Sequence, residues 1–558
     1  MEKRFPLLDE EGWREAPGWL GNVNVKQFIL PYWRSLALIL ILGTVATLSG
    51  LAQPYFTKLL IDDALLHRNF RLLVSISLGM LGVTALSYAL NSWTGYRYMQ
   101  VSAAILFHMR KAVYEHLQRL SPRFYASTRI GEIVSRLNND VGEIQRISAD
   151  TFLALTTNIL FLAGTIVIML YLNVWLSVLT FVLMPITIYG LRRTRRMLET
   201  ETESVRQRSS DLGSFLVETL MGMRTTVLMT REHYEIGRFQ QANDNFVTAL
   251  LRRQRAAIAA GLIPSASLSI GTLLVFAIGG YEVMRNGMSL GGFVAFMAYQ
   301  SRMMAPVQNV MTLYTNMATL KVAAKRVMQL MDAKTDVDDR GALRGTTIGA
   351  GHIRFNSVTF QHDRDAILQN ATFEVPVGTL SVVLGSSGAG KSSLANLLVR
   401  LYDADGGTID IDGIDIRQYP LAELRHRIAL VEQDTFLFNG TIDDNIRYGG
   451  DTVPPPAFLT LPGSTIVGDR GLAVSGGEKQ TIGIARALAR NPQILILDEA
   501  TSAMDPDLEK KVLAETRRAM SGRTIILITH RAYLAGMADL VLNVQNGLVQ
   551  VASCSKSL

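Results

Sequence analysis

Apolar residues form six long runs in the first 313 residues of the chain, and polar stretches separate most of them. The runs lie at about residues 36–56, 72–93, 152–171, 174–190, 256–280 and 290–313. A helix needs about 20 predominantly apolar residues to cross the hydrocarbon core of a bilayer, and each run is near this length. The pattern therefore predicts six membrane-spanning helices, with a tight hairpin between the third and the fourth.

Two long polar stretches, between Trp93 and Phe152 and from Arg192 to Arg255, are rich in basic residues. Basic loops stay on the cytoplasmic side of a membrane, so we expect both stretches and both termini to be cytoplasmic. Apart from isolated glycines such as Gly95, nothing interrupts a helix where the second and fourth spans enter these stretches. We therefore expect spans two to five to continue into the cytoplasm as very long helices.

The pattern changes near Gly351, where short β-type runs begin to alternate with amphipathic helices. The fold class that this predicts is a membrane α-helical bundle of six spans, followed by an α/β domain. We place an N-terminal cytoplasmic or interfacial segment at residues 1–34, the transmembrane domain at 35–335, a linker at 336–350 and the α/β domain at 351–558. The aromatic residues from Trp19 to Trp33 suit the membrane interface, and a disordered tail is the alternative.

The composition favours a multi-pass membrane protein, because 48% of the 558 residues are hydrophobic. The net charge of +7 is concentrated beside the apolar runs, where membrane topology explains it better than nucleic-acid binding does. Cys554 is the only cysteine. This excludes an intrachain disulfide and any zinc site built on several cysteines.

The α/β part contains the phosphate-loop motif G-x-x-x-x-G-K-[ST] between an apolar run and a helical one. Its residues are Gly385, Ser386, Ser387, Gly388, Ala389, Gly390, Lys391, Ser392 and Ser393. Backbone N–H groups of such a loop can surround a polyphosphate. We expect Lys391 to reach the β- and γ-phosphates and Ser392 to hold Mg²⁺. A turn with a surface lysine is the alternative, but the order of strand, loop and helix argues against it.

Polar side chains follow three other predicted strands of this domain. Asp498 and Glu499 end the run that starts at Ile494; Asp498 suits Mg²⁺ binding, and Glu499 suits the role of general base. Gln433 follows another strand, where we expect it to sense Mg²⁺ and the attacking water. His530 follows a third strand, and we expect it to contact the γ-phosphate, although a lone histidine after a strand is more often structural.

A second helix that begins with an anion-binding pattern follows Val474. Ser475 suits the N-cap position, Gly476 and Gly477 let a phosphate approach the backbone, and Glu478 completes the pattern. A second anion-binding helix end on one chain makes sense only if it closes on a nucleotide that another copy holds.

In this order, the motifs resemble the ATPase domain of ABC transporters. Residues 25–548 as a whole resemble the exporter-type half-transporters with six transmembrane helices. The resemblance makes the phosphate loop the Walker A motif and Ser475–Glu478 the signature motif. It also implies a Q-loop at Gln433, a Walker B motif ending at Asp498, a catalytic glutamate at Glu499, a D-loop at Asp505 and a switch histidine at His530.

The resemblance extends to the coupling segments of the membrane domain. Residues 124–140 resemble the first cytoplasmic coupling segment of an exporter, and residues 214–230 resemble the second. Residues 468–471 look like the short exporter loop that touches the membrane domain.

The chain departs from the family pattern at three places. His362 stands where an adenine-stacking tyrosine is usual, and its ring offers less stacking area. Glu478 stands where glutamine is commonest in the signature. The interval from Gln433 to Ser475 is short, so we expect a trimmed α-helical subdomain.

The resemblance implies that ATP hydrolysis with Mg²⁺ drives export across an inner or plasma membrane, with the ATPase domain in the cytoplasm. One complete motif set predicts a homodimer with two composite ATP sites. The substrate is expected to be amphipathic or hydrophobic: a drug-like molecule, a peptide or a lipid. A lipid flippase is the alternative. An ATP-gated channel or regulator fits the complete set of hydrolytic motifs less well. No nucleic-acid partner is expected.

Arg302 is a charged residue inside the sixth predicted span. A charge at membrane depth marks a site or pairs with a neighbouring helix. Two interpretations follow: Arg302 binds an anionic group of the cargo, or it pairs with another helix. Methionines and tyrosines near it suit either adaptable binding or ordinary packing.

Overall fold

The computed structural model describes residues 26–333, 335–337, 339, 343, 345–362, 365–386, 388–450 and 456–554. The chain divides into two compact units. We call Met1–His116 with Gly131–Asp332 the helical unit, and Leu117–Ile130 with Ala333–Leu558 the α/β unit. The predictions for residues 1–25 and for Ser387 lie outside the described residues. The domain boundaries proposed from the sequence stay predictions.

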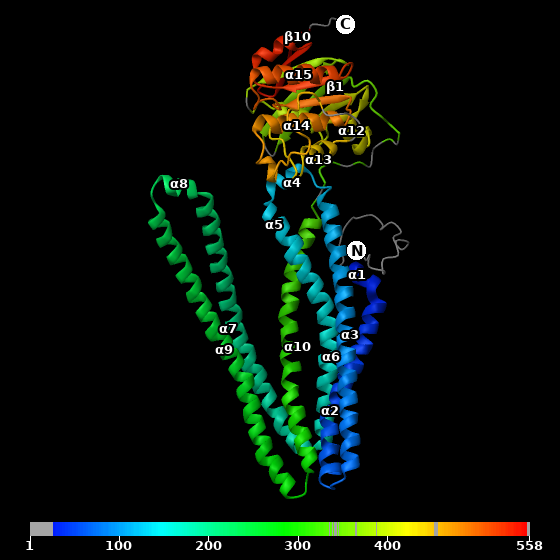
Figure 1. Cartoon of the computed structure of the whole chain (residues 1–558), viewed down its shortest axis with the longest axis vertical. Coiled ribbons are helices and arrows are strands. Elements are labelled where there is room, and N and C mark those ends of the chain that lie inside the picture. The colour runs from blue at the N-terminus through cyan, green and yellow to red at the C-terminus, as the bar shows by residue number, and fades with distance from the viewer. Residues whose placement is uncertain are drawn as a thin grey trace. The chain divides into compact units, whose positions relative to one another are not determined.

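Six long helices account for most of the helical unit (Figure 1): α2 (Trp33–Leu59), α3 (Phe70–Leu117), α6 (Val141–Leu172), α7 (Val174–Met221), α9 (Glu232–Met284) and α10 (Leu290–Met331). Helices α3 and α7 have 48 residues each and α9 has 53, whereas a span needs about 20. Helix α6 also begins ahead of the predicted third span. The prediction that spans two to five are parts of much longer helices is therefore confirmed.

Among the described residues, five helical stretches are long and apolar enough to cross a membrane: Leu30–Leu65, Phe70–Leu117, Leu153–Leu172, Val174–Met221 and Glu232–Met284. They match the first five predicted spans. Helix α10 lies at the sixth and is not among them, because Gln300, Ser301 and Arg302 interrupt its apolar run. The sixth span therefore stays a prediction.

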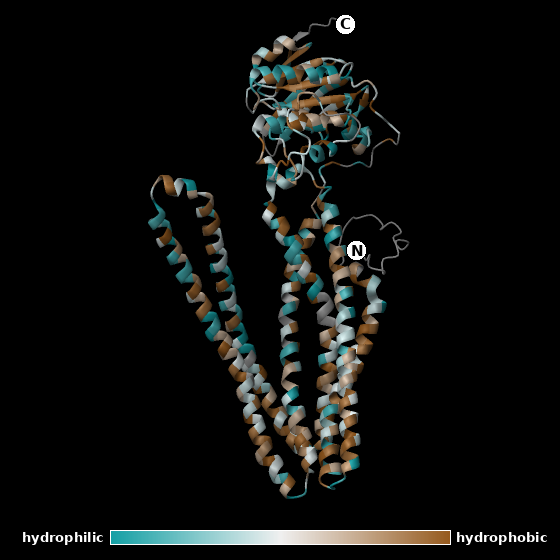
Figure 2. Ribbon diagram, in the orientation of Figure 1, coloured by the Kyte–Doolittle hydropathy of each residue, from teal (hydrophilic) through white to brown (hydrophobic). Residues whose placement is uncertain are grey.

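Helices α7 and α9 pack against each other as a hairpin that the short helix α8 (Met223–Leu228) closes. Figure 1 shows the two helices side by side along their length. In Figure 2, hydrophilic residues are more frequent on the halves that meet at α8. Helix α8 lies within residues 214–230, the segment that resembles the second coupling segment of an exporter.

Arg302 on α10 pairs with α2. Its Nη2 donates a hydrogen bond to Oε1 of Gln53 at 2.8 Å, and its Nη1 donates to the Gly50 carbonyl oxygen at 3.3 Å. The buried Tyr299 hydroxyl donates to the Leu51 carbonyl oxygen at 2.5 Å, one turn away. Of the two interpretations of Arg302, the structure shows the pairing with another helix.

One carboxylate ties the end of α2 to the start of α10. Asp62 lies in a π-helical turn, Leu60–Leu65, that extends α2. Its Oδ2 accepts a hydrogen bond from the Ser289 hydroxyl at 2.6 Å, and its Oδ1 accepts one from the Gly291 amide at 2.8 Å. The first amides of a helix lack partners within the helix, so Asp62 satisfies one of them and complements the positive helix end.

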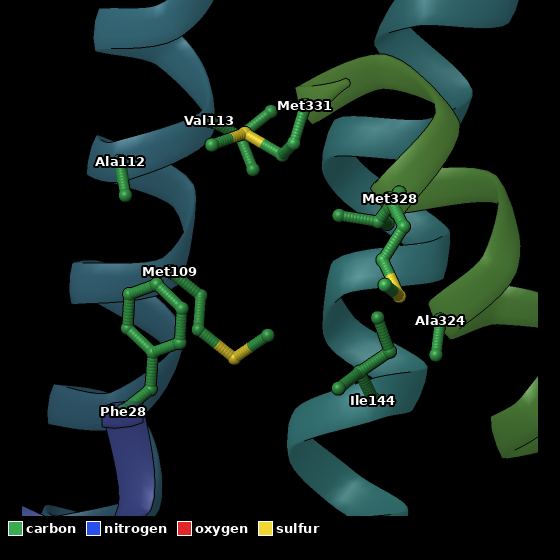
Figure 3. A pocket seen from close by; sticks show the side chains of 9 residues that line it. Phe28, Met109, Ala112, Val113, Ile144, Ala324, Met328 and Met331 are labelled. Carbon is green, nitrogen blue, oxygen red and sulfur yellow. The ribbon is translucent and has the colours of Figure 1, made fainter. Parts of the chain in front are cut away.

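A small apolar pocket lies where the short helix α1 (Lys26–Ile29) meets α3, α6 and α10 (Figure 3). Its lining consists of Phe28, Met109, Ala112, Val113, Ile144, Ala324, Val327, Met328 and Met331. Figure 3 shows Phe28 beside Met109, so α1 is held against the bundle by side-chain packing. None of the residues predicted to act on a nucleotide lines this pocket.

The α/β unit contains two sheets. The smaller is antiparallel with the order β2-β1-β4-β5, formed by β1 (Ile353–His362), β2 (Asp365–Val375), β4 (Gly406–Ile411) and β5 (Ile414–Asp415). The larger has the order β10-β9-β3-β8-β7-β6, formed by β3 (Leu380–Gly385), β6 (Ile428–Val431), β7 (Ile494–Asp498), β8 (Thr524–Ile528), β9 (Leu540–Gln545) and β10 (Leu548–Cys554). Strands β9 to β6 of the larger sheet are parallel, and β10 is antiparallel to β9.

Alternate residues of β7 serve two different hydrophobic cores. Ile494 and Ile496 belong to a core shared with the antiparallel sheet and helix α11 (Lys391–Leu398). Leu495 and Leu497 belong to a core shared with helices α14 (Gly476–Ala489) and α15 (Pro506–Ala519). Successive side chains of a strand point to opposite faces, so a continuous apolar run is needed where both faces are covered.

Residues 117–130 belong to the α/β unit, although they come from the first polar stretch of the chain. Ser121 donates a hydrogen bond to Oδ2 of Asp336 at 2.5 Å, directly before helix α4 (Pro122–Ser127). Burial and the charge of Asp336 raise the pKa of the Tyr402 phenol, and the charge of Arg123 opposes this. Helix α4 overlaps the segment that resembles the first coupling segment, so part of that segment lies on the α/β unit.

The contacts of Asp62 lead to a prediction about stability. Replacing Asp62 with Ala removes two hydrogen bonds and leaves the Gly291 amide without its partner, at a cost of about 1–2 kcal/mol. We expect Asp62→Ala to lower the thermal unfolding midpoint of the purified protein in detergent. Asp63→Ala is the matched control, because Asp63 is an exposed neighbour in the same turn. An equal loss of stability in both variants would contradict the assignment.

Candidate ATP-binding site

Parallel pairing brings the predicted site residues to one edge of the larger sheet. Val383 of β3 and Asp498 of β7 both pair with Ile528 of β8. Parallel strands end at a common edge, so the residues that follow these three strands lie together there. Gly385 ends β3 and the rest of the phosphate loop follows it; Glu499 directly follows β7, and His530 is the second residue after β8.

The glycines of the phosphate loop are required by its backbone and by close neighbours. Gly388 and Gly390 have φ angles of 80° and 99°, in the region that favours glycine. A Cβ on Gly385 would lie 2.4 Å from the Val544 carbonyl oxygen, and one on Gly390 would lie 2.9 Å from the Ile367 carbonyl oxygen. The loop therefore keeps its backbone amides clear of side chains, as a phosphate cradle requires.

Lys391 begins helix α11 and lies over the loop. Its side chain is 6% exposed, and its Nζ donates hydrogen bonds to the carbonyl oxygens of Gly385 and Ser386, both at 2.9 Å. Ala389 is buried, and its amide donates to the Ser386 carbonyl oxygen. The ammonium group is thus held inside the loop that is predicted to bind the phosphates.

Ser392 and Asp498 meet beside this loop, and their oxygens fit the ligands that Mg²⁺ prefers. The Ser392 hydroxyl is hydrogen-bonded to the Asp498 carboxylate. Burial raises the pKa of Asp498, and the nearby Glu499 charge raises it further, whereas Ser392 and Lys391 act in the opposite direction. A hydroxyl and a carboxylate are hard oxygen ligands, so the pair suits a small divalent cation.

Glu499 and His530 face each other at the ends of β7 and β8. Nδ1 of His530 lies 3.5 Å from Oε2 of Glu499. Glu499 has a φ angle of 48°, which is unusual for a residue other than glycine, and its amide donates to the Ile528 carbonyl oxygen at 3.0 Å. Such backbone strain gathers at functional sites, where the surrounding structure has to hold it in place.

Gln433 is exposed and is the second residue after β6, the strand that neighbours β7. A residue that the sequence analysis did not single out lies behind it. The buried Gln480 of α14 donates to the backbone oxygens of Gln433 and Glu499 at 3.3 and 3.4 Å, and it accepts from the Ala503 amide at 2.9 Å. It links the loop after β6 to the loop after β7. These loops are distant in sequence, so no local pattern indicated the contacts.

The predicted signature residues form a helix cap, as expected for Ser475. The Ser475 hydroxyl accepts from the Glu478 amide, and both the hydroxyl and the amide of Ser475 donate to Oε2 of Glu478 at 2.7 Å. These bonds lower the pKa of Glu478. Gly477 lies so close to the Ala503 carbonyl oxygen that a Cβ would be 3.2 Å away, and Gly476 lies next to the Ala503 side chain. Glu478, which stands where glutamine is commonest in the signature, thus forms a reciprocal helix cap with Ser475.

Asp505 and His362 are the remaining predicted site residues. Asp505 is the N-cap of α15, and its Oδ1 accepts from the amides of Asp507 and Leu508 at 3.1 and 2.9 Å. His362 ends β1, where its backbone pairs with Asp365. The His362 side chain lies outside the part of the chain that the structure describes, so its stacking role stays a prediction.

The short interval before the signature contains little helix in its described part. Helix α13 (Ile442–Arg447) and one 3₁₀ turn, Asp469–Gly471, are the helical elements there. Arg486 of α14 holds this region together: its guanidinium donates to the carbonyl oxygens of Asn445 and Phe436 at 2.9 and 2.8 Å. The arrangement agrees with a trimmed α-helical subdomain.

Comparison with known proteins identifies both parts of the chain. Residues 36–307 match the family model for the ABC transporter transmembrane region, and residues 368–502 match the one for ABC transporters. The uncharacterised ABC transporter ATP-binding protein YknV of Bacillus subtilis is 30% identical over 98% of this chain and 93% of its own. An ATP-dependent lipid A-core flippase of Syntrophus aciditrophicus is 28% identical over 92% of this chain and 88% of its own.

A solved structure supports the same assignment. The structure of a bacterial Atm1-family ABC exporter with ATP bound has a TM-score of 0.76 and 26% identity, covering 94% of this chain and 95% of that one. The fold therefore combines a helical transmembrane domain with a C-terminal α/β ATPase domain on the cytoplasmic side of the membrane. The chain is an integral membrane protein that belongs to the ABC transporters, with membrane domain and ATP-binding domain fused in exporter order.

Proposed function

We propose that this chain hydrolyses ATP as a homodimer and uses the energy to export an amphipathic or hydrophobic substrate. The observation that carries the proposal is the meeting of Lys391, Asp498, Glu499 and His530 at one sheet edge. A chain that only bound ATP would not need a carboxylate and an imidazole paired beyond the phosphate loop. The arrangement therefore favours turnover over an ATP-gated channel.

The residues at this edge take separate roles in hydrolysis. Amides of the phosphate loop and the Lys391 ammonium bind the phosphates of ATP and neutralise part of their charge. Ser392 and Asp498 hold Mg²⁺, with Gln433 beside them; the ion supplies further charge neutralisation when bound. Glu499 accepts a proton from the attacking water, and His530 orients Glu499 and the γ-phosphate.

The N-terminus of α14 supplies the other half of each composite site. Ser475, Gly476 and Gly477 present a capped helix end, with the partial positive charge that stabilises an anion. In the homodimer, this end closes on the ATP that the phosphate loop of the second copy holds, and Asp505 lies on the same face. Two ATP molecules thereby join the two ATPase domains.

The tip of the α7–α9 hairpin supports a second copy as partner. Large apolar side chains around α8 are highly exposed in one chain: Met221 is 84% exposed, Leu228 70% and Met229 65%. This tip lies on the polar, cytoplasmic side of the hairpin, where lipid does not cover it. An exposed apolar patch of this kind marks an interaction site, and we assign its partner as the second copy of the chain.

Two relatives frame the choice of substrate. One is named an ATP-dependent lipid A-core flippase and the other an Atm1-family exporter. The proposal is export of a drug-like molecule, peptide or lipid, and flipping of a lipid between leaflets is the alternative. The two are separated by ATP-dependent uptake into proteoliposomes, in which the uptake of labelled lipid is compared with the uptake of hydrophobic dyes.

Glu499→Gln is expected to abolish most hydrolysis while ATP binding is retained. The amide cannot accept the proton of the attacking water, so kcat should fall by about a hundredfold or more. Steady-state ATPase assays and binding of a fluorescent ATP analogue measure the two effects. Glu515→Gln, on α15 of the same unit, is the control and should keep wild-type activity. Full activity in Glu499→Gln would refute the general-base assignment.

Cysteine labelling tests whether a second copy covers the α8 tip. In a Cys554→Ser background, Met221→Cys and Met284→Cys lie at opposite ends of the hairpin and are 84% and 78% exposed in one chain. In the homodimer, a water-soluble maleimide should label Cys at 221 several-fold more slowly than Cys at 284. Equal labelling rates would contradict the assigned partner.

A further inference from the structure

A buried carboxylate lies behind the residues proposed for hydrolysis. Glu509, in the first turn of α15, has 0% exposure. Its Oε1 accepts a hydrogen bond from the Thr501 hydroxyl at 2.6 Å, and its Oε2 accepts from Nη1 of Arg531 at 2.8 Å and from the Tyr533 hydroxyl. A buried carboxylate persists only where it is paired and hydrogen-bonded, and Glu509 meets both conditions.

The partners of Glu509 come from two separate loops. Thr501 follows Glu499 by two residues, and Arg531 directly follows His530. Arg531 also donates from Nη2 to the Ser502 carbonyl oxygen at 2.8 Å. The guanidinium therefore contacts both the carboxylate of α15 and the backbone of the loop after Glu499. This ties the loop that carries His530 to the loop that follows Glu499.

The geometry of Glu499 and His530 needs such a tie. The two side chains approach to 3.5 Å, and Glu499 has its backbone in the left-handed region at a φ of 48°. A strained residue keeps its conformation only while the surrounding structure holds it. The Arg531 backbone is fixed as well, because its amide donates to the Thr529 hydroxyl at 3.1 Å, beside the buried end of β8.

We infer that Glu509 and Arg531 are positioning residues that hold His530 against Glu499 for ATP hydrolysis. The inference rests on the proposed function. Neither residue belongs to the phosphate loop or the predicted Mg²⁺ ligands, so they act on the rate of turnover and not on nucleotide binding. Lysine cannot replace Arg531, because a single ammonium does not span the carboxylate and the Ser502 carbonyl as the planar guanidinium does.

Arg531→Lys in the full-length protein is the main test. We expect kcat to fall by about tenfold while KM for ATP stays within about twofold, since only the transition-state geometry changes. Arg517→Lys is the matched control, because Arg517 pairs with Asp539 at 2.9 Å and donates to the Met537 carbonyl oxygen at 3.1 Å, at least six residues after Arg531. Tyr533→Phe is a milder variant, because Tyr533 is 50% exposed and the loss of its hydroxyl removes one hydrogen bond to Glu509. This variant should lower kcat several-fold.

The double variant Glu509→Gln/Arg531→Met separates positioning from general stability. It removes both charges together, so no buried charge is left unpaired. Its thermal unfolding midpoint should therefore lie closer to the wild-type value than that of a variant in which only one of the two charges is removed. We expect its kcat to stay low. Recovery of kcat together with the midpoint would overturn the inference. It would also be overturned if Arg531→Lys and Tyr533→Phe both had the same kcat as Arg517→Lys.

The same assays distinguish failure of this inference from failure of the proposed function. If wild-type protein hydrolyses ATP and Glu499→Gln does not, the proposed function stands whatever the double variant does. If Glu499→Gln keeps full activity, the proposed function fails first, and a low kcat in Arg531→Lys no longer supports positioning of Glu499.

Discussion

The parallel register of β3, β8 and β7 is the constraint on which the ATP site depends. A slip of one residue would turn every side chain of a strand to the opposite face. In β7 this would exchange Ile494 and Ile496 with Leu495 and Leu497 between two different cores, so burial on both faces fixes the register. The loops that follow these strands then meet at one edge, and the positions of Asp498, Glu499 and His530 follow from hydrophobic packing.

Polar contacts have a corresponding role in the helical unit. Apolar contact between helices gains little over contact with lipid, so packing and hydrogen bonds select neighbours. Helices α2 and α10 are joined within one chain by the contacts of Asp62, Tyr299 and Arg302. The α7–α9 hairpin ends instead in an exposed apolar tip at α8. One part of the helical unit thus has its contacts within the chain, and the other leaves an apolar surface exposed, which we propose that a second copy covers.

Much of the fold and the site was predictable, because the signals are local. Apolar runs predicted the long helices, and strand–loop–helix order predicted the position of Lys391. The partners of Arg302 and the network around Glu509 were not predictable, since they join residues far apart in sequence. The polar run in α10 also shows the limit of counting apolar residues, because tertiary packing buries its neighbours Tyr299 and Met303 among other helices.

Activity of mixed dimers tests the central claim, that each ATP site combines the phosphate loop of one copy with the signature of another. Lys391→Ala and Ser475→Arg should each inactivate both sites of a homodimer. A dimer that contains one chain of each variant keeps one intact composite site, so mixing the two in co-reconstituted vesicles should restore ATP hydrolysis. Activity no greater than the sum of the separate variants, in vesicles shown to contain mixed dimers, would contradict the account.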